Sequence, residues 1–112
     1  MVRPILAAAA ALALGACAAQ TGEVSQAALA DDGRAIAEAQ CAACHAVGEY
    51  GESPVAAAPT FRTLLARYRA DVLEEELIAG IQVSHPMPEF QFNPQGADAL
   101  IAYLRSIQAA EQ

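Results

Sequence analysis

The stretch Cys41-Ala42-Ala43-Cys44-His45 decides how the rest of this chain is interpreted. Two cysteines three positions apart, with a histidine directly after the second, form the C-x-x-C-H signature of covalent c-type haem attachment. Each thiol can add to a vinyl group of the porphyrin, and the histidine can then bind the iron as the proximal axial ligand. The pentapeptide therefore predicts one covalent haem, attached at Cys41 and Cys44 and ligated by His45.

The same five residues also fit a redox dithiol or half of a zinc site. A thioredoxin-like dithiol is expected beside a βαβ pattern, and the chain contains no such strand pattern. A structural zinc site needs further ligands, but the only other cysteine and histidine are Cys17 and His85, which do not make a second ligand pair. Haem attachment is therefore the favoured interpretation.

A second landmark, His85-Pro86-Met87-Pro88, lies in a proline-bounded loop between two helical patterns. Met87 is the only methionine besides Met1, which belongs to a segment that we expect to be removed. A lone methionine ordinarily fills a core. With a haem motif upstream, its thioether instead predicts the distal axial ligand, because His/Met pairs are an established haem ligation. His85 is the rival for that position.

Together, the order and spacing of these motifs resemble those of the class I c-type cytochromes. The resemblance runs from about Asp31 to Gln108 and includes Gly33, the haem motif, Ala58-Pro59-Thr60-Phe61, the Met-Pro loop and Leu100-Ile101-Ala102-Tyr103-Leu104. It implies an all-α fold of about four helices around one haem c. It also implies one-electron transfer rather than enzymatic turnover, with iron ligated by His and Met in both oxidation states.

Further residues are expected around the haem. In the resembled family, a proline after the motif offers its carbonyl to the second ring nitrogen of the proximal histidine, which fixes the tautomer and ring plane. Pro59 is the best match for that role. Phe61 and Leu65 are expected to pack on the haem, and Phe90 to shield its edge.

Hydrophobic periodicity and capping residues predict helices over residues 31–41, 60–68, 71–79 and from Pro94 onward. The expected N-caps are Asp31 or Asp32, Asp71 and Asn93. Gly80 should end the third helix, whose buried side is expected to comprise Val72, Leu73, Leu77 and Ile81. The resemblance implies that the first helix crosses the last one closely at Gly33, beside Tyr103.

The first 16 residues resemble an export signal, with Arg3 as its positive start and an apolar segment too short to span a membrane. Leu14-Gly15-Ala16-Cys17 then resembles the lipobox of bacterial lipoproteins, in which the cysteine is lipidated and becomes the N-terminus. This interpretation accounts for the third cysteine. Ordinary cleavage after Ala28-Leu29-Ala30 is the alternative.

We therefore expect a signal peptide over residues 1–16, the lipid-anchor cysteine Cys17 with a flexible tether over 17–30, and a cytochrome c domain over 31–112. The domain should be monomeric and lie on the periplasmic side. It would be held at a membrane by the lipid on Cys17, or be soluble in the periplasm if ordinary cleavage removes that residue.

The chain is acidic, with 6 arginines, no lysine and 13 Asp or Glu residues, for a net charge of −7. This charge argues against strong nucleic-acid binding and favours redox protein partners with a basic docking face. Two alternative functions stay open. One is a haem-based gas sensor or peroxidase-like protein in which Met87 dissociates, and the other is an electron-relay subunit of a larger oxidoreductase.

Overall fold

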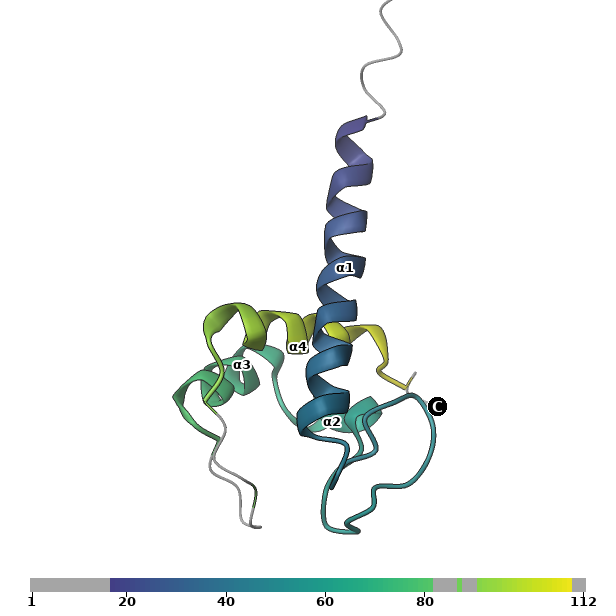
Figure 1. Ribbon diagram of the computed structural model, residues 1–112, viewed down its shortest axis with the longest axis vertical. Helices are drawn as coiled ribbons and strands as arrows, with labels where there is room; N and C mark the ends of the chain where they lie inside the picture. Colours follow the sequence, from purple (N-terminus) through teal and green to yellow (C-terminus); the bar gives the residue numbers. More distant parts are fainter. Residues whose placement is uncertain (1–16, 82–86, 88–90, 110–112) are drawn as a thin grey trace, which may run out of the picture.

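The described part of the protein contains four α-helices and one short 3-10 helix, joined by loops. The computed structural model describes residues 17–81, Met87 and residues 91–109, with side chains from Ser25 onward. The elements are α1 (Cys17–Gln40), η1 (Phe61–Thr63), α2 (Leu64–Arg67), α3 (Ala70–Ala79) and α4 (Pro94–Ser106), arranged as in Figure 1. The described residues form no strand, and the predicted all-α fold is confirmed.

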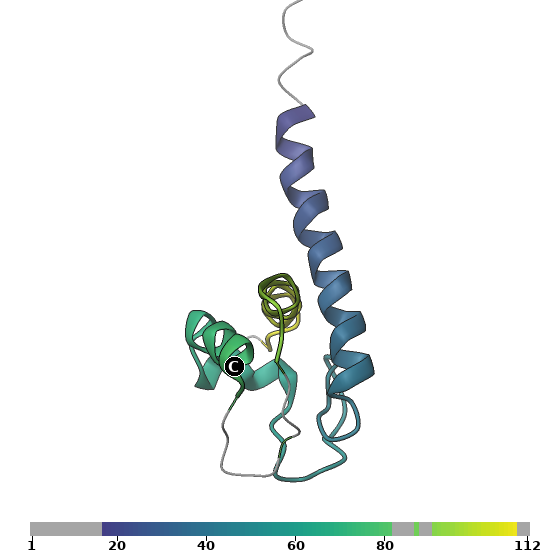
Figure 2. The same cartoon turned by 60° about the vertical axis from the view of Figure 1, so that its left-hand side comes forward.

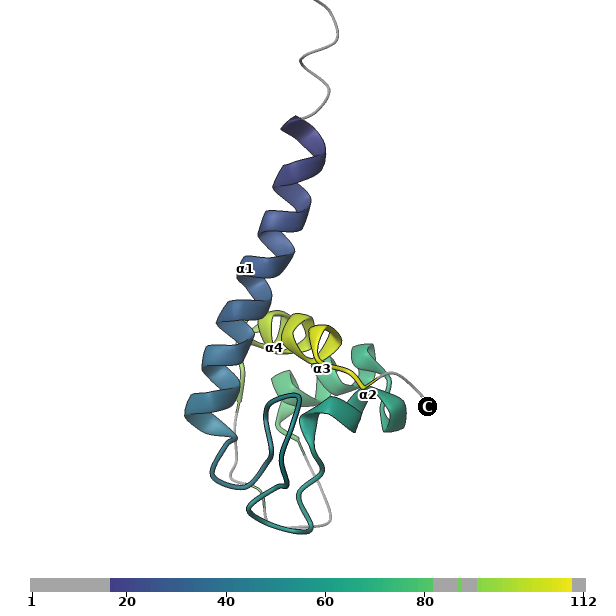
Figure 3. The same ribbon diagram turned by 90° about the vertical axis from the view of Figure 1, so that its right-hand side faces the viewer.

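The first helix begins much earlier than predicted. It starts at Cys17, so Asp31 and Asp32 lie inside it and neither is an N-cap. Residues 17–30, expected to be a flexible tether, belong to the same continuous helix. Its 24 residues span about 36 Å, and the N-terminal half projects away from the other helices (Figures 1 and 3). Among the described residues, no helix has the length and apolarity needed to cross a membrane.

The helical conformation of residues 17–30 has a local cause. This segment is rich in alanine and glutamine, which favour helix by intrinsic propensity. It lacks hydrophobic periodicity, and a periodicity argument therefore missed it.

The predicted crossing of the first and last helices is confirmed, and Gly33 makes it possible. A Cβ atom on Gly33 would lie 2.0 Å from the carbonyl oxygen of Ala99 and 2.8 Å from Cβ of Tyr103. One turn further along α1, Ala37 is 0% exposed. Two small residues on one face thus let the α1 backbone approach α4 directly (Figure 1).

The last helix forms as its sequence predicts. The side chain of Asn93 accepts a hydrogen bond from the backbone N–H of Gly96 at 2.7 Å, and Pro94 occupies the first turn. Its apolar residues Leu100, Ile101, Tyr103 and Leu104 are all buried, and so is Ile107, which directly follows the helix. These residues supply the centre of the hydrophobic core.

The predicted helix over residues 60–68 is present as η1 followed by α2. The side chain of Gln108, beyond α4, holds this segment in place. Its Nε2 donates to the carbonyl oxygens of Phe61 at 2.9 Å and Leu104 at 2.7 Å, and its Oε1 accepts from the backbone N–H of Leu65 at 3.0 Å. These three bonds fix the position of Phe61 relative to α4.

Two details of the third helix differ from the prediction. The N-cap residue is Arg69, and Asp71 lies in the first turn, where its carboxylate pairs with the Arg69 guanidinium at 2.6 Å. The hydrogen bond from Arg69 lowers the pKa of Asp71 below its ordinary value. Val72 is 44% exposed and is not part of the buried side. Gly80 does end the helix, with a φ of 97° that favours glycine.

Candidate haem-binding site

The haem motif forms a tight turn at the C-terminal end of α1. The backbone N–H groups of Cys44 and His45 donate to the carbonyl oxygen of Cys41, at 3.1 and 2.9 Å. The N–H of Cys41 in turn donates to the carbonyl oxygen of Ala37 at 2.9 Å. The turn brings two free thiols and one imidazole together, with Cys41 8% exposed and Cys44 half-buried.

The environment of Cys41 does not suit a redox dithiol. Burial of this thiol raises its pKa to about 11, from an ordinary 9.0. Cys41 also follows the C-terminal end of α1, where the helix dipole disfavours a thiolate. Reactive cysteines in disulfide oxidoreductases have lowered pKa values instead.

The described residues contain no cluster of three or more His, Cys, Asp or Glu side chains able to hold a metal ion.

The imidazole of His45 is buried and held in one orientation. Its Nδ1 lies 2.7 Å from the carbonyl oxygen of Pro59. A carbonyl can only accept a hydrogen bond, so Nδ1 is the donor, and in the neutral imidazole the lone pair is then on Nε2. This is the arrangement that orients metal-ligating histidines. The expected contact of Pro59 is therefore present, and the two thiols with this imidazole fit a covalent haem.

The loop after the motif folds back onto it. The backbone N–H of Val55 donates to the carbonyl oxygen of Cys44 at 3.2 Å. The N–H of Ala46 donates to Oγ of Ser53 at 3.0 Å, and its carbonyl oxygen accepts from the N–H of Phe61 at 2.9 Å. The backbone on both sides of His45 is thus fixed by residues further along the chain.

Tyr103 joins α4 to the same loop. Its hydroxyl donates to the carbonyl oxygen of Val47 at 2.8 Å, across 56 positions of sequence. On α1, the guanidinium carbon of Arg34 lies 5.8 Å from the centroid of the Tyr103 ring, within the range of a cation–π contact. Sequence reasoning placed Tyr103 at the helix crossing but missed this contact, and nothing in the sequence signalled the role of Ser53.

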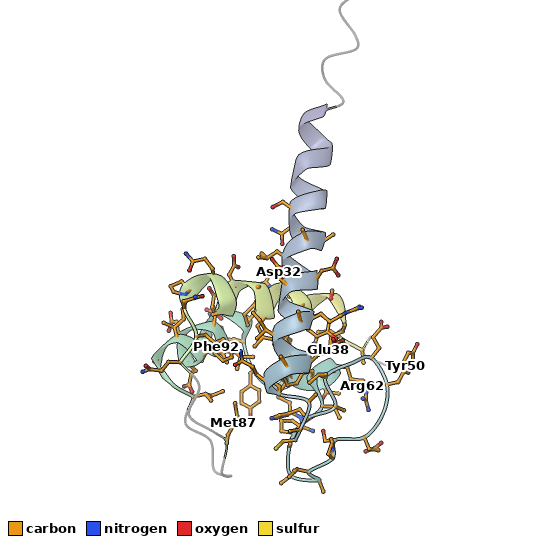
Figure 4. The ribbon with its side chains drawn as sticks, viewed as in Figure 1. Asp32, Glu38, Tyr50, Arg62, Met87 and Phe92 are labelled. Atoms are coloured by element: carbon orange, nitrogen blue, oxygen red, sulfur yellow. The ribbon has the colours of Figure 1, made fainter. Side chains whose placement is uncertain are left out.

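The structure describes only some of the other residues that were predicted to surround the haem. Phe61 is buried, with its ring centroid 5.3 Å from that of His45 and an interplanar angle of 54°. Leu65 is half-buried and packs against the core. Met87 is half-buried and lies at the same end of the molecule as the C-terminal end of α1 (Figure 4). Phe90 and His85 lie outside the described residues.

Comparison with protein families gives one match, a family described as Cytochrome c, over residues 30–108. This range covers well over half of the chain. It includes the haem motif, Pro59, Met87 and both sides of the helix crossing. The comparisons with curated proteins and with solved structures gave no match.

Proposed function

Because the chain belongs to the cytochrome c family, we propose that it is a one-electron carrier of an exported bacterial electron-transfer chain. Its cofactor is a covalently bound haem c, which supplies one-electron chemistry by cycling between ferric and ferrous iron. The observation that carries the proposal is the fixed orientation of the buried His45 imidazole, with Nδ1 bonded to Pro59 and its position directly after the two thiols.

Each residue of the site then has a distinct role. Cys41 and Cys44 form the two thioether bonds, and Nε2 of His45 is the proximal ligand. The Pro59 carbonyl accepts a hydrogen bond from Nδ1 and so fixes the tautomer and the ring plane of the imidazole. The Phe61 ring lies against the imidazole and helps to exclude water from the proximal side.

Met87 is proposed as the distal ligand. It is half-buried, and of the described residues on either side of it, Phe92 donates a backbone hydrogen bond of 3.1 Å to the carbonyl oxygen of Leu77. Ligation by both His45 and Met87 would leave no open position on the iron. For this reason we propose electron transfer without substrate turnover, rather than gas sensing or peroxide chemistry.

We expect Met87→Ala to abolish the weak far-red sulfur–iron absorption band and to lower the reduction potential, because a thioether ligand raises it. His85→Ala, the matched control in the same loop, should leave the band unchanged. Optical spectra and redox titration of the purified holoprotein measure both effects. A wild-type protein that lacks this band, and whose potential changes in His85→Ala but not in Met87→Ala, would make His85 the ligand. Rapid binding of carbon monoxide to the native ferrous protein would favour a sensor.

We further propose that Cys17 is lipidated and becomes the N-terminus of the mature protein. The support is the lipobox-like Leu14-Gly15-Ala16-Cys17, which lies directly after the apolar segment of the expected export signal. With the anchor there, residues 17–30 of α1, before the crossing with α4, would be a helical spacer about 20 Å long. It would hold the haem domain at a set height above a membrane, within reach of membrane-bound redox partners.

Replacement of Cys17 by serine should release the protein into the soluble exported fraction, since the acyl chains supply the stable anchoring. The haem spectrum should not change, because Cys17 lies outside the haem motif. Mass spectrometry of the wild-type protein should find an acylated N-terminal cysteine. An unmodified chain that begins near Asp31 would instead establish ordinary signal cleavage.

A further inference from the structure

The loop of residues 48–57, which follows the haem motif in the sequence, exposes an aromatic ring. Tyr50 is 87% exposed, more than the other large apolar side chains of the described residues, and Val55 in the same loop is 43% exposed. Figure 4 shows the Tyr50 side chain pointing away from the body of the molecule, beyond Arg62. Aromatic side chains, tyrosine above all, are enriched at the centres of protein interfaces.

This loop is fixed in place without a partner. Besides the bonds from Val55 to Cys44 and from Ala46 to Ser53, Nη1 of Arg62 donates to the carbonyl oxygen of Gly51 at 2.7 Å. A surface that is already ordered loses little conformational entropy when a partner binds. The hydrogen bond from Val55 to Cys44 also joins this loop directly to one of the two cysteines proposed to carry the haem.

The charge around Tyr50 is negative. Glu49 and Glu52 flank it and are exposed, and residues 46–60 contain no arginine or lysine. Arg62, bonded to this loop, directs Nη1 at the backbone of Gly51. The surface thus combines an aromatic centre with an acidic rim. A partner that matches it has an apolar pocket with a positively charged rim.

A second acidic surface, on α3, is the rival docking site. It exposes Glu75, Glu76 and Val72. However, α3 lies on the opposite side of α4 from α1, which leads into the haem motif (Figure 2). The loop is bonded directly to Cys44, so it is the better placed of the two for electron exchange.

We propose that residues 48–57 form the docking surface for the electron-exchange partner, a redox protein with a positively charged rim around an apolar pocket that receives the Tyr50 ring. This inference rests on the proposed function and adds the location and chemistry of the contact. In one encounter, a single electron passes from the ferrous protein to the oxidised centre of the partner, and no bond is made or broken.

The test compares two oxidants of the ferrous holoprotein at low ionic strength. Tris(1,10-phenanthroline)cobalt(III) is cationic and apolar, like the proposed partner surface, whereas hexacyanoferrate(III) is anionic. Tyr50→Ala and the pair Glu49→Gln with Glu52→Gln should lower the second-order rate constant with the cobalt complex several-fold. The controls on α3 are the pair Glu75→Gln with Glu76→Gln, which removes the same two charges, and Val72→Ala, which removes an exposed apolar side chain. Both should leave the rate constant close to the wild-type value.

If the two double substitutions, in the loop and on α3, lower the rate constant with the cobalt complex equally, only the net charge of the protein matters. That result would overturn the docking proposal. Loop variants that react with the cobalt complex at the wild-type rate would also overturn the docking proposal, but they would leave the proposed function intact. If neither oxidant oxidises the ferrous protein, the proposed function itself is contradicted.

A second readout does not depend on electron transfer. Tris(1,10-phenanthroline)ruthenium(II) is cationic, apolar and redox-inert towards the protein in the dark. Its titration into the holoprotein should shift the backbone amide resonances of residues 49–55 in NMR spectra. Shifts confined to residues 71–76 would place the cationic, apolar contact on α3 and reject the loop.

Discussion

Replacing both Cys41 and Cys44 by serine is expected to abolish accumulation of the haem-containing protein, which is the largest effect that we predict. Serine hydroxyls cannot form the thioether bonds that hold the porphyrin. A domain of this size has a marginal core of its own, and the cofactor supplies buried apolar area that its side chains lack. The protein without haem should therefore fold poorly and be degraded.

The measurement is a pyridine haemochrome assay of the exported fraction, together with acid–acetone extraction of the wild-type protein. Extraction should leave the haem on the wild-type chain, and each single cysteine variant should have less holoprotein. Ala43→Ser is the matched control, because it adds a hydroxyl at an exposed position and keeps the C-x-x-C-H pattern. Haem that extracts freely from the wild-type protein would refute covalent attachment.

The second large effect is expected from Gly33→Ala at the crossing of α1 and α4. The added methyl carbon would lie 2.0 Å from the carbonyl oxygen and 2.6 Å from the carbonyl carbon of Ala99. Both are backbone atoms, so the clash is relieved only if the two helices move apart. Such overpacking should cost about 3 kcal/mol, the upper end of the usual range, because backbone atoms are in the way. Alanine regains roughly 1 kcal/mol in helix propensity, so the free energy of unfolding should fall by about 2 kcal/mol.

Denaturant unfolding of the holoprotein, followed by circular dichroism, measures this loss. Gly48→Ala is the control, since a Cβ at Gly48 meets nothing within 4 Å. It should change the free energy of unfolding by less than about 1 kcal/mol. A Gly33→Ala protein as stable as this control would show that the helices do not cross as closely as the structure has them.

The sequence by itself was sufficient for the parts of this protein whose chemistry is local. Cys41, Cys44 and His45 carry their signal in five consecutive residues, since covalent attachment and ligation need only that spacing. The start of α4 was equally predictable, because the Asn93 side chain caps a helix whose first residue is its immediate neighbour Pro94. The order and spacing of the motifs resemble those of the class I c-type cytochromes, and this resemblance implied the all-α fold that the structure confirms.

Only the tertiary structure decided how the rest of the site is assembled. The contacts of His45 with Pro59, of Ala46 with Ser53 and of Val47 with Tyr103 join residues 14, 7 and 56 positions apart. A resemblance suggested the first of these, and no local pattern encodes the other two. The start of α1 at Cys17 was likewise missed, because an exposed helix follows alanine propensity without a hydrophobic stripe. Periodicity reports which face of a helix is buried, and it carries no signal where a helix has nothing to pack against.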